Sequence, residues 1–196
     1  MPRLRSEDRR NAILAAATRI IASEGLAAAT AAIAKEAGVS NGSLFVYFDT
    51  KAALLNELYV ALKTEMTAAA LAGLPAEREP REQVFHMWTQ WLGWATANPE
   101  KRRALAQLDV ADEITADTHE TVRSAFRGIA ELLERSLADG PMRDAPLGFA
   151  LSLTSAIADA TIDAMIREPA EAEARSRVAF DAMWRVLAGS SVPVTA

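Results

Sequence analysis

The 196-residue sequence contains no cysteine, which excludes disulfide bonds, thiolate nucleophiles and cysteine-ligated zinc and suits a reducing compartment. Its only histidines are His86 and His119, and neither belongs to a His-x-x-x-His or Glu-x-x-His pair. The sequence also lacks a phosphate-binding glycine loop and a G-x-S-x-G elbow. We therefore expect no metal site, no cofactor and no enzymatic activity.

Long apolar runs are missing too, although 51% of the residues are hydrophobic. No segment approaches the roughly 18 uninterrupted apolar residues that a membrane span needs. The basic N-terminus MPRLRSEDRR is not followed by the apolar stretch of a signal peptide. These absences predict a soluble, cytoplasmic protein without a membrane partner.

Positive charge is scarce as well, since the formal net charge is -5, and this at first disfavours nucleic acid as a partner. The deficit is uneven along the chain. Residues 1–50 hold six Lys or Arg and five Asp or Glu, whereas the remainder holds 15 and 21. Several of the early arginines lie close to the N-terminus, among them Arg3 and Arg5. These two are equally compatible with a DNA-contacting arm and with a solubilising tail.

Strand signals are absent, whereas apolar residues recur at helical spacing along almost the whole chain. The pattern predicts an all-α protein of about nine helices, the first of them capped by Ser6. We expect these helices at about residues 6–25, 30–37, 40–48, 50–73, 80–97, from 99 onward, 115–137, 147–168 and 170–188.

The segment AGVSNGSLFVYFDTKAALL, residues 37–55, interrupts the helical pattern with two glycines and two serines. Gly38 permits a left-handed turn that ends one short helix, and Ser40 is a candidate N-cap for the next. Leu44 and Phe48 are four residues apart and are expected to face the core. Two short helices joined by such a turn form a helix-turn-helix, whose second helix can lie in the DNA major groove.

The outward side of this second helix is expected to carry Asn41, Ser43, Val46 and Tyr47. The amide of Asn41 has the geometry for a bidentate pair with adenine, and Val46 can contact a thymine methyl group. The alternative is that a neighbouring element covers Val46 and Tyr47.

The segment from Ile33 to Leu55, IAKEAGVSNGSLFVYFDTKAALL, resembles the tetracycline-repressor (TetR) family of bacterial transcriptional regulators. It is close to the family pattern I-A-x-x-A-G-V-S-x-G-x-L-Y-x-Y-F-x-x-K-x-x-L-L. The resemblance implies a DNA-binding domain at residues 1–50, with the start of a connecting helix that reaches about residue 72. Residues 51–196 would then bind an effector and form a homodimer on a palindromic operator.

By position in this pattern, the resemblance also assigns DNA contacts. They fall on Thr30, Ser40, Asn41, Gly42, Ser43, Val46, Tyr47 and Lys51. The chain departs from the pattern at Phe45, where many members have tyrosine, so a phosphate bond from that hydroxyl is lost.

One helix beyond this segment is unusually aromatic, because it carries Trp88, Trp91 and Trp94. Core packing is the default role for such rings, and the alternative is that some of them line a pocket for a flat or apolar ligand.

The helix expected at residues 147–168 carries small residues four apart, namely Ala156, Ala160 and Ala164. If the family pattern holds, these residues allow close approach in a four-helix bundle that this helix and the last one form in a homodimer.

The sequence therefore predicts a DNA-binding transcriptional regulator, most simply a repressor that a small-molecule effector releases from its operator. An alternative keeps the DNA-binding domain but gives the C-terminal domain a protein partner in place of a small molecule. A third class, an all-α enzyme, requires a convergent acid, base or metal constellation that the sequence does not offer.

Overall fold

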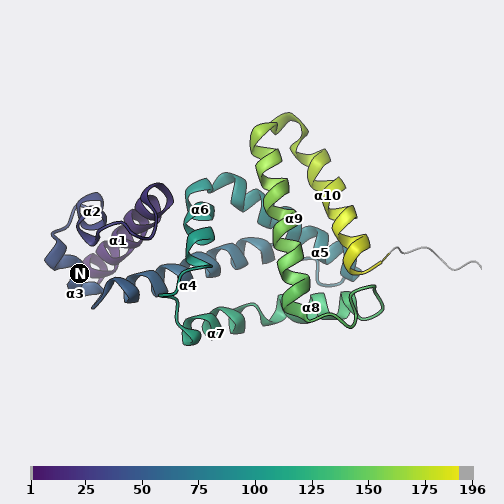
Figure 1. The fold of residues 1–196 in the computed structure, drawn as a ribbon, viewed down its shortest axis with the longest axis horizontal. Helices are drawn as coiled ribbons and strands as arrows, with labels where there is room; N and C mark the ends of the chain where they lie inside the picture. The colour runs from purple at the N-terminus through teal and green to yellow at the C-terminus, as the bar shows by residue number, and fades with distance from the viewer. Residues whose placement is uncertain (1, 190–196) are drawn as a thin grey trace, which may run out of the picture. The chain divides into compact units, whose positions relative to one another are not determined.

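The structure, a computed structural model, describes residues 2–189, with side chains from residue 6 onward. These residues form ten α-helices and one 3₁₀-helix, and the described part of the chain contains no strand (Figure 1). The all-α prediction is therefore confirmed, with one α-helix more than expected.

The described residues divide into two compact units. Unit 1 comprises the chain up to Glu65 together with Asn98–Ala125, and unit 2 comprises Met66–Ala97 together with the chain from Phe126 onward. Two helices from the middle of the sequence thus pack with the N-terminal helices. The functional boundary near residue 50 stays a prediction.

Unit 1 is built around its first helix. Its elements are α1 (Pro2–Glu24), α2 (Thr30–Glu36), α3 (Asn41–Tyr47), most of α4 (Lys51–Leu71), α6 (Pro99–Leu108) and α7 (Ala116–Ala125). The first helix begins at Pro2, and proline is favoured in a first helical turn because its missing N–H would have no partner there. Ser6 therefore lies inside the helix, and its predicted role as N-cap is wrong.

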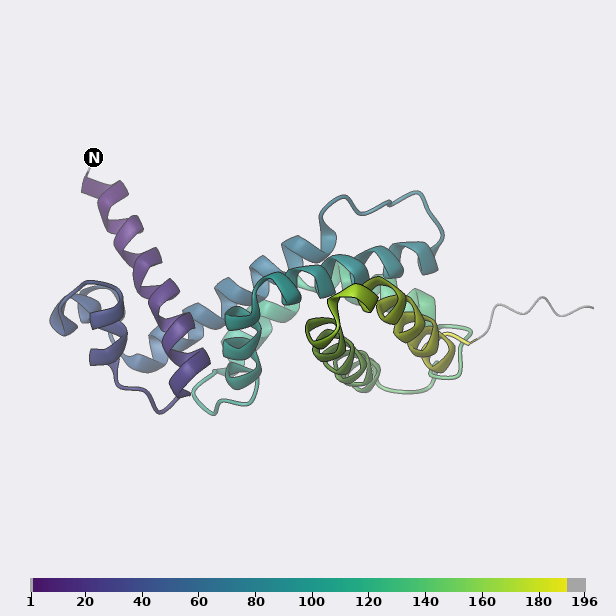
Figure 2. The same cartoon turned by 90° about the horizontal axis from the view of Figure 1, so that it is seen from above.

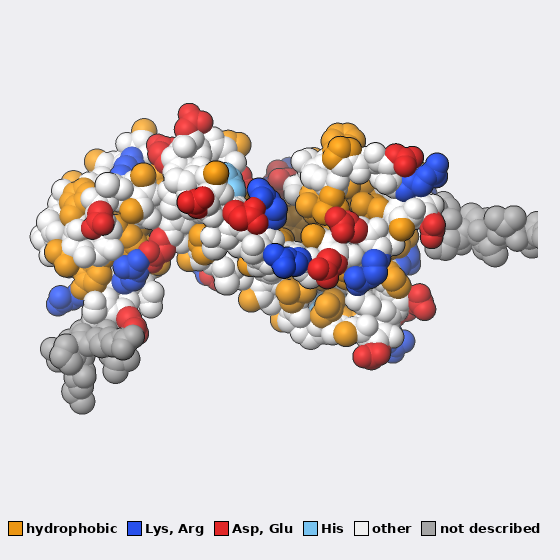
Figure 3. Space-filling view, turned by 90° about the horizontal axis from the view of Figure 1, so that it is seen from below, with side chains coloured by type: hydrophobic (Ala, Val, Ile, Leu, Met, Phe, Trp, Pro, Cys, Tyr) orange, Lys and Arg blue, Asp and Glu red, His pale blue; other side chains and the backbone are white. Residues whose placement is uncertain are grey.

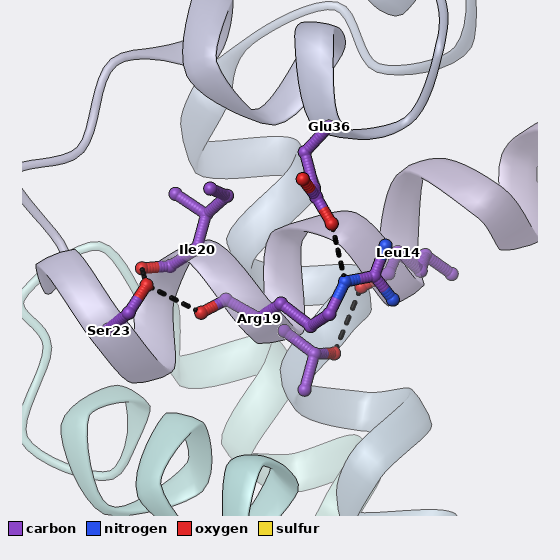
Figure 4. A network of polar contacts seen from close by, with 6 residues as sticks. Leu14, Arg19, Ile20, Ser23 and Glu36 are labelled. Carbon is purple, nitrogen blue, oxygen red and sulfur yellow. Dashed lines mark hydrogen bonds and ion pairs between the residues drawn. The ribbon is translucent and has the colours of Figure 1, made fainter.

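The apolar face of α1 forms the core of unit 1. Ile13, Ala17 and Ile21 recur every four residues and are fully buried, because this spacing places them on one side of a helix. On the polar side, Arg19 Nε donates a 2.7 Å hydrogen bond to Glu36 Oε1, which ties α1 to the end of α2 (Figure 4). The position of α2 is thus set by both faces of α1.

The loop after α6 is held against α4 within unit 1. The hydroxyl of Tyr59 donates a 2.8 Å hydrogen bond to Asp109 Oδ1, and Lys63 Nζ lies 2.8 Å from the same carboxylate. Asn56 Oδ1 accepts a 2.9 Å bond from the backbone N–H of Thr115. Burial, and then the hydrogen bond to Asp109, raise the pKa of Tyr59 above its ordinary value of 10.0.

Unit 2 packs α5 against the last three α-helices. Its elements are the end of α4, α5 (Pro80–Ala97), α8 (Arg127–Leu137), α9 (Leu147–Arg167), the 3₁₀-helix η1 (Pro169–Glu171) and α10 (Ala172–Leu187). The two views in Figures 1 and 2 both show α9 and α10 side by side, joined through η1.

One sequence expectation for the C-terminal helices needs correction. The single helix expected at 115–137 is broken at Phe126, which separates α7 from α8. Among the described helices, α9 is long and apolar enough to cross a membrane by length and composition, with 22% of its most apolar window buried. One such helix is weak evidence for a membrane span.

Candidate nucleic-acid interface

The turn between α2 and α3 is closed by backbone hydrogen bonds around a left-handed glycine. Gly38 has a φ of 69°, which L-residues with a side chain rarely adopt. Its N–H donates to Lys35 O at 3.1 Å, and the N–H of Val39 donates to Ala34 O at 3.0 Å. This pair of bonds is a Schellman motif, and it satisfies the carbonyls that the end of α2 leaves open. The predicted glycine turn is confirmed.

Ser40 caps the N-terminus of α3, as predicted from the sequence. Its Oγ accepts a 3.0 Å hydrogen bond from the N–H of Ser43, one of the donors that the first turn leaves without a helical partner. The hydroxyl of Ser43 in turn lies 2.8 Å from Ser40 Oγ. Both serine side chains are thus engaged with each other at the helix start.

The two sides of α3 differ sharply in burial. Leu44 and Phe48 are buried, as expected from their spacing. Val46 lies about 180° around the helix from them and is 80% exposed, so no described element covers it. Asn41 and Gly42 are also exposed, while Ser43 and Tyr47 are half-buried. The side of α3 that points away from the core is open for a partner.

Arg10 fixes the C-terminal end of α3 from a position on α1. Its Nη1 donates a 3.1 Å hydrogen bond to Tyr47 O, and its guanidinium lies 4.7 Å from the centre of the Phe48 ring. The other side of the guanidinium forms a bidentate pair with the carboxylate of Glu57 on α4. The hydrogen bond to Glu57 raises the pKa of Arg10 further, so the guanidinium stays charged. One side chain therefore connects α1, α3 and α4.

Arg10 is one of the N-terminal charges of the sequence, but no role in the site was predicted for it. The only available signal was a basic residue three positions before the buried Ile13, which is common on helix surfaces. Its partners lie 37 and 47 residues away, so no local pattern could reveal them.

The two predicted DNA contacts that flank the helix-turn-helix have different surroundings. Lys51, the first residue of α4, donates to Leu26 O at 2.6 Å and to Ala28 O at 2.7 Å. Its ammonium group therefore braces the loop between α1 and α2. Thr30 is the first residue of α2 and is half-buried, and the N-cap before it, Ala29, has no side-chain cap bond.

The early arginines do not form a simple basic patch. Arg10 and Arg19 are paired with carboxylates of their own unit. The backbone of residues 3 and 5 belongs to α1 rather than to an extended arm, and their side chains lie outside the described part of the chain. On the face drawn in Figure 3, blue and red side chains are interspersed. Among the described residues, no group of three or more His, Cys, Asp or Glu is placed to hold a metal ion.

The three tryptophans of α5 have different surroundings within unit 2. Trp88 is 2% exposed, and its Nε1 donates to Ser176 Oγ at 3.0 Å, so it is a core residue with a satisfied donor. Trp94 is also buried, whereas Trp91 is half-buried and meets the Trp88 ring edge-on at a centroid distance of 6.3 Å. A ligand contact by any of them stays a prediction.

A groove of about 700 Å³ runs along α9 and α10. Ala156, Ala160 and Ala164 line it from α9, and it is bordered from α10 by the exposed Val178. The three alanines named from the sequence thus share one face.

Helix-turn-helix geometry with an open second helix defines a class, the helical DNA-binding proteins. Residues 13–58 match the profile of the family described as "Bacterial regulatory proteins, tetR family". Similar solved structures include a protein described as a tetR family transcription regulator from Shewanella sp. PV-4, with 25% identity over 92% of this chain and 98% of that chain and a TM-score of 0.82. Another is a TetR family transcription regulator from Marinobacter aquaeolei VT8, with 20% identity, 95% and 98% coverage and a TM-score of 0.80.

A third similar fold is the transcriptional regulator FadR from Bacillus subtilis, solved in complex with stearoyl-CoA. Its identity is 15%, over 91% of this chain and 98% of that chain, with a TM-score of 0.66. Residues 13–58 therefore match the TetR family of bacterial regulatory proteins, and the chain has the fold of TetR family transcription regulators, which supports a DNA-binding regulator.

Proposed function

We propose that this protein is a cytoplasmic, homodimeric repressor that a small-molecule effector releases from a palindromic operator. The observation that carries the proposal is the open side of α3, where Asn41 and Val46 are exposed while Leu44 and Phe48 are buried. Residues of these types contact base edges in the major groove. The DNA contacts proposed around them are Thr30, Ser40, Gly42, Ser43, Tyr47 and Lys51, with Arg3 and Arg5 as a possible addition.

The groove on α9 and α10 supports the homodimer. Its alanines leave the helix backbones accessible to close packing, and α10 adds Val178, which is 68% exposed. A two-fold axis along this groove would place the same alanines opposite each other in a four-helix bundle. Covering by a second copy also accounts for the apolar character of α9. A hydrocarbon environment does not, because Asp159 and Asp163 lie in the middle of that helix.

Release from DNA requires the effector to prefer one of two dimer conformations. In the bound form the two recognition helices must lie about 34–36 Å apart, or a multiple of this, to enter successive major grooves. An effector that binds both conformations equally does not shift the equilibrium between them. Release therefore depends on the difference between the effector's affinities for the two conformations. The fold neighbour solved in complex with stearoyl-CoA supports a small-molecule ligand for this chain. In unit 2, Trp91 and Trp94 are the candidates to line its site.

The second candidate function replaces the small molecule with a protein partner of unit 2. The exposed Phe149 and Leu151 at the start of α9 favour it, because exposed apolar side chains can mark a protein contact. A screen of operator release distinguishes the two. Release of the operator by small molecules, fatty acyl-CoA among them, supports a small-molecule effector. Release only by an added protein supports a protein partner of unit 2.

The first experiment is selection of bound sequences from random duplex DNA at low salt. We expect enrichment of one palindrome, bound more weakly as salt rises because phosphate charges are neutralised in the complex. The double substitution Asn41→Ala and Tyr47→Ala should abolish this binding while leaving folding and dimerisation intact. Asn11→Ala, an exposed asparagine on α1, is the matched control. Sequence-specific binding retained by the double variant would contradict the assignment of α3.

A further inference from the structure

We propose that α3 reads its operator through the methyl groups of thymine, with Val46 and Phe45 as the contacting side chains. The inference rests on the proposed function, since it needs α3 in the major groove. It goes beyond that function because it names the kind of base pair that the helix selects and adds Phe45 to the site.

Val46 and Phe45 are both exposed on the part of α3 that would face the DNA. Val46 is 80% exposed at the centre of the outward side of α3, and the preceding residue, Phe45, is 39% exposed on its flank. In the major groove, thymine is the base that presents a methyl group, and apolar side chains are its usual partners. A phenylalanine at this position offers no hydrogen bond to a phosphate, so contact with an apolar group is the chemistry left to it.

Gly42, one turn before Val46, also supports a close approach of DNA to this side of α3. Its φ is not left-handed, and a Cβ built there meets nothing closer than Ser40 Oγ at 4.0 Å. The fold therefore does not require a glycine, although glycine weakens a helix relative to alanine. A bare backbone beside Val46 is explained if another surface, here the floor of the groove, approaches the helix closely.

The polar groups of α3 are too few to carry the readout alone. The helix, NGSLFVY, contains no Arg or Lys to recognise guanine and no Asp or Glu to recognise cytosine. The hydroxyl of Ser43 is engaged with Ser40 Oγ at 2.8 Å. Asn41 remains as the polar reader, and its amide fits adenine. Adenine and the thymine methyl belong to the same base pair, so the half-site should carry A·T pairs beneath α3.

Replacement of single thymines by uracil tests this directly. Uracil forms the same base pair but lacks the methyl group. With the selected operator as probe, we expect uracil at one or two positions of each half-site to weaken binding about fourfold, the amount for one buried methyl group. Uracil in the flanks should have no effect. If the operator is bound and uracil is harmless everywhere, the inference is overturned and the proposed function stands.

Double-mutant cycles then assign each methyl group to a side chain. In Val46→Ala the penalty for uracil should disappear at one position, and in Phe45→Ala at another. Val110→Ala, an equally exposed valine of unit 1, and Phe149→Ala, a 54% exposed phenylalanine of unit 2, should keep both penalties. A uracil penalty that survives in both α3 variants would overturn the assignment. Failure to select any operator would overturn both this inference and the proposed function.

Discussion

The ammonium nitrogen of Lys51 lies 2.6 Å from the carbonyl oxygen of Leu26, in the loop between α1 and α2. A second bond, to Ala28 O, is 2.7 Å long. An ammonium group has three N–H donors, and these bonds use two of them. Lys51 therefore holds the loop before α2 with two of its donors, and the phosphate contact proposed for it is a second, separable role.

Substitution of Lys51 by methionine should show both roles. The free energy of unfolding should fall by about 1–2 kcal/mol, because two partly buried carbonyls lose a charged donor. The slope of log affinity against log salt should become shallower by about 0.9, the amount for one phosphate contact. Urea denaturation and operator binding over a salt series measure the two effects. Lys101→Met, which removes a surface pair with Glu65, is the control. An unchanged salt slope would leave Lys51 with the bracing role alone.

Gly42→Ala should separate stability from binding. Alanine is the better helix former, so the free energy of unfolding should stay the same or rise by about 0.5–1 kcal/mol. Operator affinity should nevertheless fall severalfold, because the added methyl group stands between α3 and the groove. Gly93→Ala, at an exposed helical position where a Cβ also meets nothing, should give the stability gain without the loss of affinity. Equal affinity of both variants and the parent protein would argue against close approach at Gly42.

The turn and cap of the helix-turn-helix could be predicted because their signals are local. Gly38 and Ser40 act on atoms within five residues of themselves, so spacing alone identifies them. The roles of Arg10 and Lys51 could not be predicted, because their partners are brought close only by the packing of α1, α2 and α4. The break at Phe126 had only a weak signal, Gly128 two residues later, since neither proline nor a turn dipeptide marks it.

The exposure of Phe45 on α3 could not be predicted from the sequence either. Periodicity separates Leu44 and Phe48 from Val46, but Phe45 falls on the flank, where burial depends on which neighbouring helix lies alongside. The groove on α9 and α10 was easier to anticipate, because alanines four apart share a face in any helix.

Arg10→Gln should destabilise the protein more than Arg19→Gln. Arg10 pairs with Glu57, donates to Tyr47 O and lies over the Phe48 ring, whereas Arg19 makes one exposed pair with Glu36. After allowance for partial exposure of the Arg10 pair, we expect losses of about 1–2 kcal/mol and below about 0.5 kcal/mol, respectively.

Operator affinity should follow the same order, because the C-terminal end of α3 loses its anchor in Arg10→Gln. Chemical denaturation and operator titration, at temperatures where both variants remain folded, measure the difference. Arg10→Lys, which keeps the charge but not the bidentate geometry, should fall between the parent and Arg10→Gln. Equal effects at positions 10 and 19 would mean that the contacts of Arg10 with Tyr47 and Phe48 contribute no more than a surface ion pair.

Tyr59 should make the folded protein sensitive to alkaline pH. Its pKa is raised by burial and by the bond to Asp109, so the folded state keeps the phenolic proton at a pH where the unfolded chain has lost it. Its contribution to stability is complete below about pH 10 and falls above it, by up to about 1.36 kcal/mol per pH unit. Tyr59→Phe should flatten this decline relative to the parent protein.

The ionisation of Tyr59 can be followed directly because the chain has two tyrosines. In a Tyr47→Phe background, the tyrosinate absorbance reports Tyr59 alone. Its midpoint should lie above the ordinary value and coincide with alkaline unfolding. Ionisation at the ordinary pKa while the protein remains folded would show that the phenol is not held by Asp109 in solution.

Ala160→Arg tests the groove on α9 and α10 as the homodimer interface. In a two-fold bundle each arginine would meet the partner's symmetry-related surface, so both bulk and like charge would oppose association. We expect the variant to be a folded monomer by analytical ultracentrifugation. Because each half of a palindrome would then be bound singly, operator affinity should fall by about 10²-fold or more. Ala106→Arg, at an exposed alanine of α6, should remain dimeric and keep its affinity. A dimeric, fully active Ala160→Arg protein would move the subunit contact to another surface and leave the groove without its proposed partner.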